Sequence, residues 1–482
     1  MEEQQKQPQV KIGIEIHQQL DTNKLFCSCP SVLRQDEPTL IIKRKMKAVV
    51  GETGEIDEAA AFEQAKEREF IYEAYKDSNC LVELDEEPPH EINKEALVTC
   101  LQVALLLNCR IFPVTQVMRK TIINGSCVSG FQRTILVAED GFFEIEVDGR
   151  KKKIGIQSIA LEEDAAREIE RTEKSVTFRL DRLGIPLIEL TTKPDISSPE
   201  EAKIAALKLG EILRACKVKR GIGTIRQDVN ISVGDHPRVE IKGVQEPDLI
   251  VRVLEYEIKR QQQEKIKKPE VRKANQDGST TFIRPLAGAA RMYPETDLPL
   301  IYTSEFVKEA KKTLPKLKEE IQLELRERGM NPEFIKLILQ EQKLEEFKAL
   351  EKIVKKPNLI AKMLVLWPKE IARSEKFELK EVEKKLSTDL IEFLLEKVAK
   401  GEISEAQIKQ VMLDVVRGKE LEKAIKQEKV DLHEVENYIQ QLLKTKQGLS
   451  FNAYMGLIMQ KYKGKINPRD AADILKKYVK GF

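Results

Sequence analysis

A glutamate and a histidine stand two residues apart in the stretch KIGIEIHQQL, near the start of the chain. Apolar Ile12, Ile14 and Ile16 alternate there with polar residues, and a period of two is typical of a half-buried strand. Glu15 and His17 therefore project from one face of the predicted strand. A carboxylate beside an imidazole suits a hard divalent ion or a proton-transfer site. For a single pair of this kind, a solvated strand face is the commoner case.

Two later strands repeat the polar-face pattern. In TIRQDVNISV, one face carries Arg226, Asp228 and Asn230. In RVEIKG, one face carries the polar residues Arg238, Glu240 and Lys242. Several strands that bear acids, a histidine and arginines indicate a sheet with a polar concavity.

Further acidic residues lie in two apolar stretches. Glu189 sits inside GIPLIELTT, where an unpaired carboxylate would be costly to bury. LEED adds Glu162, Glu163 and Asp164, and alternation alone does not choose among these three. The pattern is equally consistent with two interpretations, a site for a metal and phosphate or a polar sheet face that is merely solvated.

Cys27 and Cys29 form a C-x-C pair that could supply half of a structural zinc site. Such a site needs four ligands, and the sequence offers no second close pair. We therefore expect no zinc and interpret the cysteines as ordinary thiols, with the other five standing alone: Cys80, Cys100, Cys109, Cys127 and Cys216.

The first 300 residues must supply the sheet that positions these groups. Short β-branched runs punctuated by Gly and Pro predict strands, and Asp148-Gly149 predicts a hairpin turn. Ser198 followed by Pro199 predicts the start of a helix, and Asn93 predicts another that ends near Asn108.

Beyond residue 300 the chain turns Lys- and Glu-rich with helical periodicity. We predict an α+β protein of three domains: a mixed β-sheet cradle over 1–300, an all-α domain over 301–400 and a small helical tail over 401–482.

Composition narrows the class of protein. Charged residues make up 34% of the chain, yet the net charge is only +2, so both signs are interleaved. We expect a cytoplasmic protein, because there is no apolar run long enough for a membrane helix, no signal peptide and no paired cysteine framework.

Five stretches together resemble the tRNA-dependent amidotransferase B/E family. They are GIEIHQQLDTNKLFCSCP, ALEEDAAR, DRLGIPLIELTTKPDISSPEEA, GIGTIRQDVNIS and RPLAGAARMYPETDLPLI, in order across the first 300 residues. Within the family, IHQQLDT, GTIRQDVN and ARMYPETD are most similar to the archaeal E subunit of glutamyl-tRNA(Gln) amidotransferase.

The resemblance implies a reaction. ATP phosphorylates the side-chain carboxylate of glutamate carried on tRNA(Gln), and ammonia then displaces phosphate to give glutaminyl-tRNA. Mg²⁺ would assist phosphoryl transfer. The chain shows no amidase or asparaginase signature, so the resemblance implies a separate asparaginase-like glutaminase, the D subunit, in a heterotetramer with two copies of each chain.

The resemblance also implies roles for residues. Mg²⁺ ligands and catalytic groups would be Glu15, His17, Glu163, Glu189 and Asp228. ATP or the acyl group would be faced by Lys120, Arg119 and Arg226, oriented by Glu240, although structural ion pairs are equally plausible for these four.

One departure from the archaeal relatives is expected just before TTFIRPL. They usually carry an inserted domain there that resembles one of bacterial aspartyl-tRNA synthetase, and here only VRKANQDGS, with an Asp277-Gly278 turn, bridges the point. A bacterial-type B subunit that also acts on aspartyl-tRNA(Asn), another ATP-dependent carboxylate ligase and a non-catalytic tRNA scaffold remain alternatives.

The C-terminal tail is predicted to bind tRNA. From Leu457 onward seven side chains are basic and two are acidic. Tyr462 and Tyr478 could stack on bases. A solvated lysine-rich helix is the alternative for the candidate contacts Lys461, Lys463, Lys465, Lys476, Lys477 and Lys480.

Overall fold

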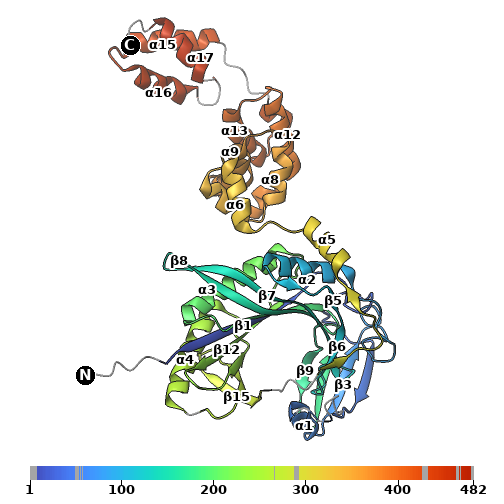
Figure 1. Cartoon of the computed structure of the whole chain (residues 1–482). Helices are drawn as coiled ribbons and strands as arrows, with labels where there is room; N and C mark the ends of the chain where they lie inside the picture. Colours follow the sequence, from blue (N-terminus) through green and yellow to red (C-terminus); the bar gives the residue numbers. More distant parts are fainter. Residues whose placement is uncertain are drawn as a thin grey trace, which may run out of the picture. The chain divides into compact units, whose positions relative to one another are not determined.

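The structure of the chain is a computed structural model. It describes residues 8–48, 54, 56, 58–264, 266–286, 292–425, 432–462, 466 and 468–478. The chain divides into two compact units, residues 1–318 and residues 319–482. The predicted α+β class is confirmed, because strands dominate the first unit and helices the second (Figure 1).

The first unit is built on one large, mostly antiparallel sheet. In the described residues it has eleven strands, with the path β15-β14-β13-β12-β1-β11-β8-β7-β6-β16 and β4 beside β7. Its strands are β1 (Val10–Gln19), β4 (Arg110–Ile111), β6 (Val117–Thr121), β7 (Phe131–Val147), β8 (Arg150–Glu163), β11 (Pro186–Thr192), β12 (Ile225–Val233), β13 (Val239–Lys242), β14 (Glu270–Ala274), β15 (Thr280–Pro285) and β16 (Met292–Pro294).

Two smaller sheets complete the strands of this unit. A four-stranded sheet has the order β2-β3-β10-β9, and a two-stranded one pairs β17 with β5, among the residues described. The strands are β2 (Leu40–Arg44), β3 (Glu69–Ala74), β5 (Val114–Thr115), β9 (Arg167–Arg171), β10 (Ser175–Arg179) and β17 (Ile301–Tyr302).

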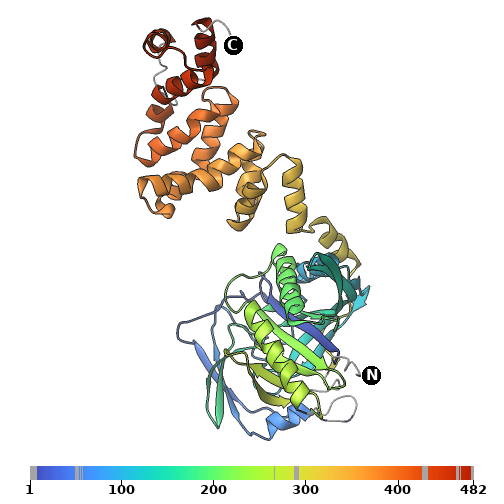
Figure 2. The same ribbon diagram turned by 90° about the vertical axis from the view of Figure 1, so that its left-hand side faces the viewer.

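Three helices, α2 (Lys94–Leu106), α3 (Pro199–Ala215) and α4 (Pro247–Gln263), cover one face of the large sheet (Figures 1 and 2). The opposite face carries the polar side chains of the pocket. The three helices pack on β1, β7, β8 and β12, and their shared core includes Ile12, Ile14 and Ile16, none of which is exposed. The helices of the unit are α1 (Glu58–Gln64), α2 (Lys94–Leu106), α3 (Pro199–Ala215), α4 (Pro247–Gln263) and α5 (Ser304–Lys312).

The second unit consists of helices in the residues described. One apolar core runs from Leu325 to Ala424 and another from Val435 to Leu475. The helices are α6 (Lys318–Glu327), α7 (Pro332–Gln340), α8 (Leu344–Glu351), α9 (Pro357–Ala361), the π-helix η1 (Lys362–Leu366), α10 (Trp367–Glu375), α11 (Leu379–Lys385), α12 (Thr388–Ala399), α13 (Glu405–Val416), α14 (Leu421–Ile425), α15 (Leu432–Thr445), α16 (Phe451–Lys461) and α17 (Pro468–Tyr478). None of the described helices is long and apolar enough to cross a membrane.

The local signals of the sequence fix several element ends. The Asn93 and Ser198 side chains cap α2 and α3 by accepting backbone N–H bonds, as predicted. Asp148 and Gly149 both have positive φ and connect β7 to β8. The segment VRKANQDGS is more than a bridge, because its first part forms β14, and its Asp277-Gly278 turn leads into β15.

The boundaries of the three predicted domains stay a prediction. Helix α5 packs against α2, so the first compact unit continues beyond residue 300, to Lys318. The core that begins at Leu325 includes Val411, Met412 and Val416 of α13, beyond residue 400.

We predict that Ile14→Ala lowers the free energy of unfolding of the first unit by about 2–5 kcal/mol, because Ile14 is fully buried in the central strand. Ile41→Ala is the matched control, since Ile41 lies on β2 and is 59% exposed; it should cost less than about 1 kcal/mol. Urea unfolding followed by circular dichroism measures both. The single tryptophan, Trp367, reports the second unit and should not shift. Equal costs for the two variants would contradict the burial argument.

Candidate metal and phosphate site

The register of β1 gathers the candidate donors on the polar face of the large sheet. On one side His17 lies opposite Glu189 of β11. On the other side Glu15 lies opposite Asp228 of β12, and His17 lies opposite Arg226. Directly opposed residues of neighbouring strands have their Cβ atoms about 5 Å apart. Four of the predicted donors therefore meet around two consecutive positions of one face.

The distances define two overlapping donor groups that share His17. His17 Nε2 lies 3.5 Å from Glu15 Oε1 and 3.3 Å from Glu189 Oε2. Ligand atoms of Glu15, His17 and Asp228 all lie within 4.8 Å of one another, and so do those of His17, Glu162 and Glu189. Carboxylate oxygens with one imidazole nitrogen form a donor set for a divalent ion.

Two lysines balance part of this negative charge. Lys120 Nζ is paired with Glu162 and lies 3.4 Å from Glu189 Oε2. Lys242 Nζ donates to Asp228 Oδ2 at 2.9 Å and is also paired with Glu240. Each donor group thus has its own ammonium group at one edge.

Burial and crowding perturb the titration of the central groups. Desolvation and then the charge of Glu189 raise the pKa of Glu15 to about 7. Burial opposes the charged form of Glu189, but Lys120 and His17 outweigh it and lower the pKa of Glu189. Burial likewise opposes protonation of His17, yet the hydrogen bond to Glu189 raises its pKa. Glu15 therefore loses its proton near neutral pH, and burial raises the pKa of Glu162 as well.

The face opens into a pocket of about 350 Å³. The fit of a hard cation is supported by a buried oxygen with no hydrogen-bond partner, Oδ1 of Asn230, two residues from Asp228 and opposite Gly13 and Glu240. The lining side chains include Glu15, His17, Lys120, Gln132, Glu162, Asp164, Glu189, Arg226, Arg238, Glu240, Lys242 and Arg284.

Two of the predicted site residues lie elsewhere. Glu163 points to the other side of β8 and contacts Arg133, whose Nη1 lies 3.4 Å from Glu163 Oε2. Arg119 does not line the pocket; it pairs with the buried Glu295 and lies over the Phe131 ring. The remaining predicted residues of the sheet converge at or beside the pocket.

Glu162 and Lys242 are among the polar candidates that the sequence offers, but neither was predicted as a site residue. Glu162 follows Leu161 and precedes Glu163 in the same strand, so only the sheet register shows which one faces His17. Glu162 also accepts hydrogen bonds from Gln132 and Thr134. Lys242 and Glu240 lie on the same face of β13, which the alternation in the sequence predicts. The sequence does not show that Lys242 pairs with Asp228 of the neighbouring strand.

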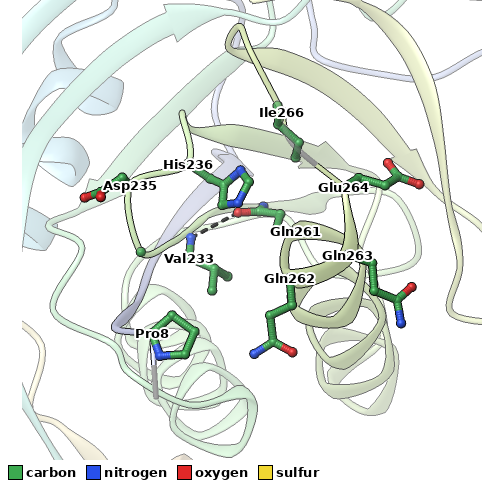
Figure 3. Close-up of a pocket in the computed structure, with 10 residues that line it drawn as sticks. Pro8, Val233, Asp235, His236, Gln261, Gln262, Gln263, Glu264 and Ile266 are labelled. Atoms are coloured by element: carbon green, nitrogen blue, oxygen red, sulfur yellow. Dashed lines mark hydrogen bonds between the residues drawn. The ribbon is translucent and has the colours of Figure 1, made fainter. Parts of the chain in front are cut away.

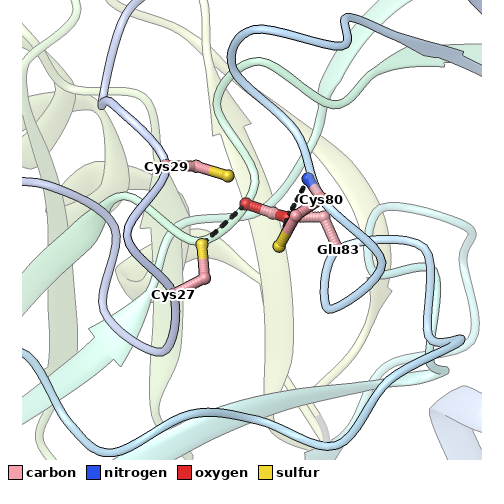
Figure 4. Close-up of side chains that lie close together, drawn as sticks. All are labelled: Cys27, Cys29, Cys80 and Glu83. Atoms are coloured by element: carbon pink, nitrogen blue, oxygen red, sulfur yellow. Dashed lines mark hydrogen bonds between the residues drawn. The ribbon is translucent and has the colours of Figure 1, made fainter.

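The cysteines are free thiols, but Cys80 does not stand alone. Cys27, Cys29, Cys80 and Glu83 have ligand atoms within 4.8 Å of one another (Figure 4). Cys27 and Cys80 each donate to Glu83 at 3.1 Å, and Glu83 also pairs with the fully buried Lys24 at 2.8 Å. The premise that the C-x-C pair lacks a nearby partner is wrong; the expectation of no zinc stays a prediction that metal analysis of the protein tests.

Another pocket of about 560 Å³ lies where β12 ends, beside the end of α4. The Gln261 side chain accepts a hydrogen bond from the Val233 backbone there, at 3.0 Å. Figure 3 shows Asp235 and Glu264 pointing away from each other on opposite sides. Because its charged groups do not converge, this pocket is not a candidate for the chemistry.

Comparison with known families matches both parts of the chain. The model of the GatB/GatE catalytic domain matches residues 10–309, which include every donor described above. The model of the GatB domain matches residues 345–479.

Curated relatives match over nearly the whole chain. The E subunit of the glutamyl-tRNA(Gln) amidotransferase of Methanocaldococcus jannaschii is 35% identical over 98% of both chains, and that of Archaeoglobus fulgidus is 33% identical over 98% of both. The alignment with the first extends over 625 positions, whereas this chain has 482 residues, so the relative contains segments that this chain lacks. This agrees with the missing insertion. The corresponding protein of Methanothermobacter thermautotrophicus is 45% identical over 62% of this chain and 47% of its own length.

We predict that affinity for Mn²⁺, a spectroscopic substitute for Mg²⁺, falls below pH 7. The raised pKa means that Glu15 holds a proton in that range and must release it to bind a metal. Each proton released contributes about one unit to the slope of log Kd against pH. Electron paramagnetic resonance of free Mn²⁺ between pH 5.5 and 8 measures this slope.

Glu15→Gln should lower that slope by about one proton and weaken binding at pH 8. The control is Glu146→Gln, an exposed glutamate on β7 outside the pocket. A slope that is the same in wild type and Glu15→Gln would contradict the assignment of Glu15.

Proposed function

The chain belongs to the GatB/GatE family, and from this premise we propose that it converts glutamyl-tRNA(Gln) to glutaminyl-tRNA(Gln) at the pocket on β1. The γ-phosphoryl group of ATP is transferred to an oxygen of the glutamate side chain, giving an acyl phosphate and ADP. Ammonia then attacks the carbonyl carbon, and phosphate leaves. The observation that carries the proposal is the register that sets Glu15 against Asp228 and His17 against Glu189.

The donor groups support a role for Mg²⁺ in the first step. Glu15, His17 and Asp228 would hold one ion, and His17, Glu162 and Glu189 offer a second position. Bound Mg²⁺ supplies charge neutralisation to the phosphates during transfer. Glu162 takes the place expected for Glu163, because Glu163 is bound to Arg133.

Other side chains of the pocket orient these donors. The Gly243 N–H and Lys242 fix the two oxygens of Asp228, at 2.9 Å each. Lys120 holds Glu162 and Glu189 together on the opposite side. Arg226 donates to both oxygens of Asp164, and that ion pair forms one wall where the glutamyl group would enter.

The ammonia requires a second protein. The relatives are named as one subunit of an amidotransferase, which supports a multi-subunit enzyme. We expect an asparaginase-like glutaminase as the D subunit, two copies of each chain and glutamine as the amido donor. Because tRNA is charged in the cytoplasm, we expect the enzyme to act there.

Ammonium is the direct test of this division of labour. We predict that the chain with ATP, Mg²⁺ and ammonium forms glutaminyl-tRNA without the glutaminase, because all the activating donors lie on this one chain. Thin-layer analysis of the amino acid released from the tRNA measures the product. A ligase that needs no tRNA would consume ATP with free glutamate, and a scaffold would consume none; either result would overturn the proposal. Parallel reactions with aspartyl-tRNA(Asn) decide whether the substrate range is that of the bacterial B subunit.

We predict that Asp228→Ala lowers amidation by more than about 100-fold while tRNA affinity is retained. Loss of groups that merely support metal ligands costs about 10–100-fold, and Asp228 is a direct candidate ligand. Asp235→Ala is the matched control, an exposed aspartate two residues beyond the end of β12. Near-normal product formation by Asp228→Ala at saturating Mg²⁺ would sink the assignment.

The tail remains the candidate tRNA-binding surface. Lys461, Lys476 and Lys477 are exposed on α16 and α17. Lys463, Lys465 and Lys480 lie outside the described residues. The predicted stacking by Tyr462 is wrong, because Tyr462 is only 4% exposed and packs edge-on against Tyr438. Tyr478 is 41% exposed, with its hydroxyl bound to Glu436.

We predict that replacing Lys476 and Lys477 together with alanine raises the KM for glutamyl-tRNA and flattens the salt dependence of its binding. Each lost phosphate contact removes roughly one unit from the slope of log K against log salt. Point changes suit this test, because deleting the chain after Gln447 would expose Val435, Ile439 and Leu442 of α15, which share the core of α16 and α17.

The control replaces two exposed lysines of α11, Lys380 and Lys384, in the same way. Equal effects of the two double variants would show a general charge effect. An unchanged KM and salt slope in the tail variant would make the tail a solvated helical cap.

A further inference from the structure

The cations expected to contact phosphate already have acidic partners. Lys120 is paired with Glu162 and Glu189, and Arg226 with Asp164. Arg119 lies outside the pocket, against Glu295. Because a carboxylate neutralises each of these side chains, the positive charge that a polyphosphate needs must come from elsewhere.

Two other arginines line the same pocket. Arg238 directly precedes β13, and Arg284 lies in β15. Within the described part of the chain, no carboxylate lies within ion-pair distance of either guanidinium group. Among the residues that the structure describes, the Arg284 side chain has one hydrogen bond, a long one from Nη1 to the Pro285 carbonyl at 3.5 Å.

Resting on the proposed function, we propose that Arg238 and Arg284 form the polyphosphate-binding end of the pocket, where they hold the phosphates of ATP beside the candidate metal ligands. Guanidinium groups suit this task, because their fork of N–H donors binds two phosphate oxygens at once.

The strand register sets both arginines around Glu240. Arg238 is two residues before Glu240, which corresponds to about 6.6 Å along a strand. Glu240 lies opposite Val271 of β14, and Val271 lies opposite Arg284 of β15. Two strand spacings are about 9.6 Å. The two guanidinium groups therefore flank the edge that Glu240 and Lys242 share with Asp228.

The charge distribution suits an extended polyphosphate chain such as that of a nucleoside triphosphate. Glu15, Glu162 and Glu189 gather around His17, where a cation would bind. The arginines without acidic partners lie on the β13–β15 side, where the lining acid Glu240 is paired with Lys242. A nucleoside triphosphate that reaches from the candidate metal ligands to Arg238 and Arg284 would place its terminal phosphate at the ligands and its inner phosphates at the arginines. This order would suit phosphoryl transfer, because a divalent ion held by Glu15, His17 and Asp228 would supply charge neutralisation next to the reacting phosphate.

Nucleotide binding to the whole chain tests the proposal. Isothermal titration calorimetry in Mg²⁺ measures the affinity for ATP, ADP and adenosine in wild type, Arg238→Ala, Arg284→Ala and the double variant. We expect each single change to weaken ATP and ADP binding about tenfold or more, as for loss of a charged hydrogen bond, with little change for adenosine. Lysine at both positions should restore part of the affinity.

Arg150→Ala is the matched control, an exposed arginine at the β7–β8 turn, and should bind like wild type. Circular dichroism verifies that each variant is folded. Unchanged ATP affinity in the double variant would overturn the role of the arginines and leave the proposed function standing. Loss of tRNA affinity with unchanged ATP affinity would assign them to tRNA phosphates and also overturn it. Absence of ATP binding by wild type, with and without glutamyl-tRNA, would instead overturn the proposed function.

Discussion

The antiparallel pairing of β1 with β11 and β12 is the constraint on which the site depends. One strand buries Ile12, Ile14 and Ile16 against the helices and presents Glu15 and His17 to the pocket. A slip of one residue in either ladder would turn these faces over and place carboxylates in the apolar core. The free energy that fixes the fold is thus the same free energy that aligns the candidate ligands.

Crowded acids are the electrostatic consequence of that alignment. Five carboxylates line a pocket of about 350 Å³, and like charges this close together disfavour ionisation of all of them at once. Lys120 and Lys242 offset part of the charge at the two edges. The remaining repulsion affects the two neighbouring carboxyl groups differently: the pKa of Glu15 is raised and that of Glu189 is lowered. Perturbed carboxyl pKa values of this kind cluster at functional sites.

Much of the fold followed from short-range signals, because alternation, caps and turn residues act over a few positions. The faces of β1 and the ends of α2 and α3 are of this kind. Contacts between residues that are distant in the sequence could not be predicted in this way. Glu162 and Glu163 differ only in which neighbour each meets across the sheet. Likewise Cys80 lies beside Cys27 although the two are far apart in the sequence, and no local sequence pattern predicts this contact.

The long sequence separation between β1 and its two partner strands has a consequence for synthesis. Val10 pairs with Val233, and Glu15 with Thr191. At translation rates of about 5–20 residues per second, β1 waits roughly 9–35 seconds for β11 and roughly 11–45 seconds for β12. Until β11 has been made, β1 has no neighbouring strand to pair with, and long-range strand pairing is slow in itself. The apolar face of β1 therefore stays without its strand neighbours while more than half of the first unit is being made.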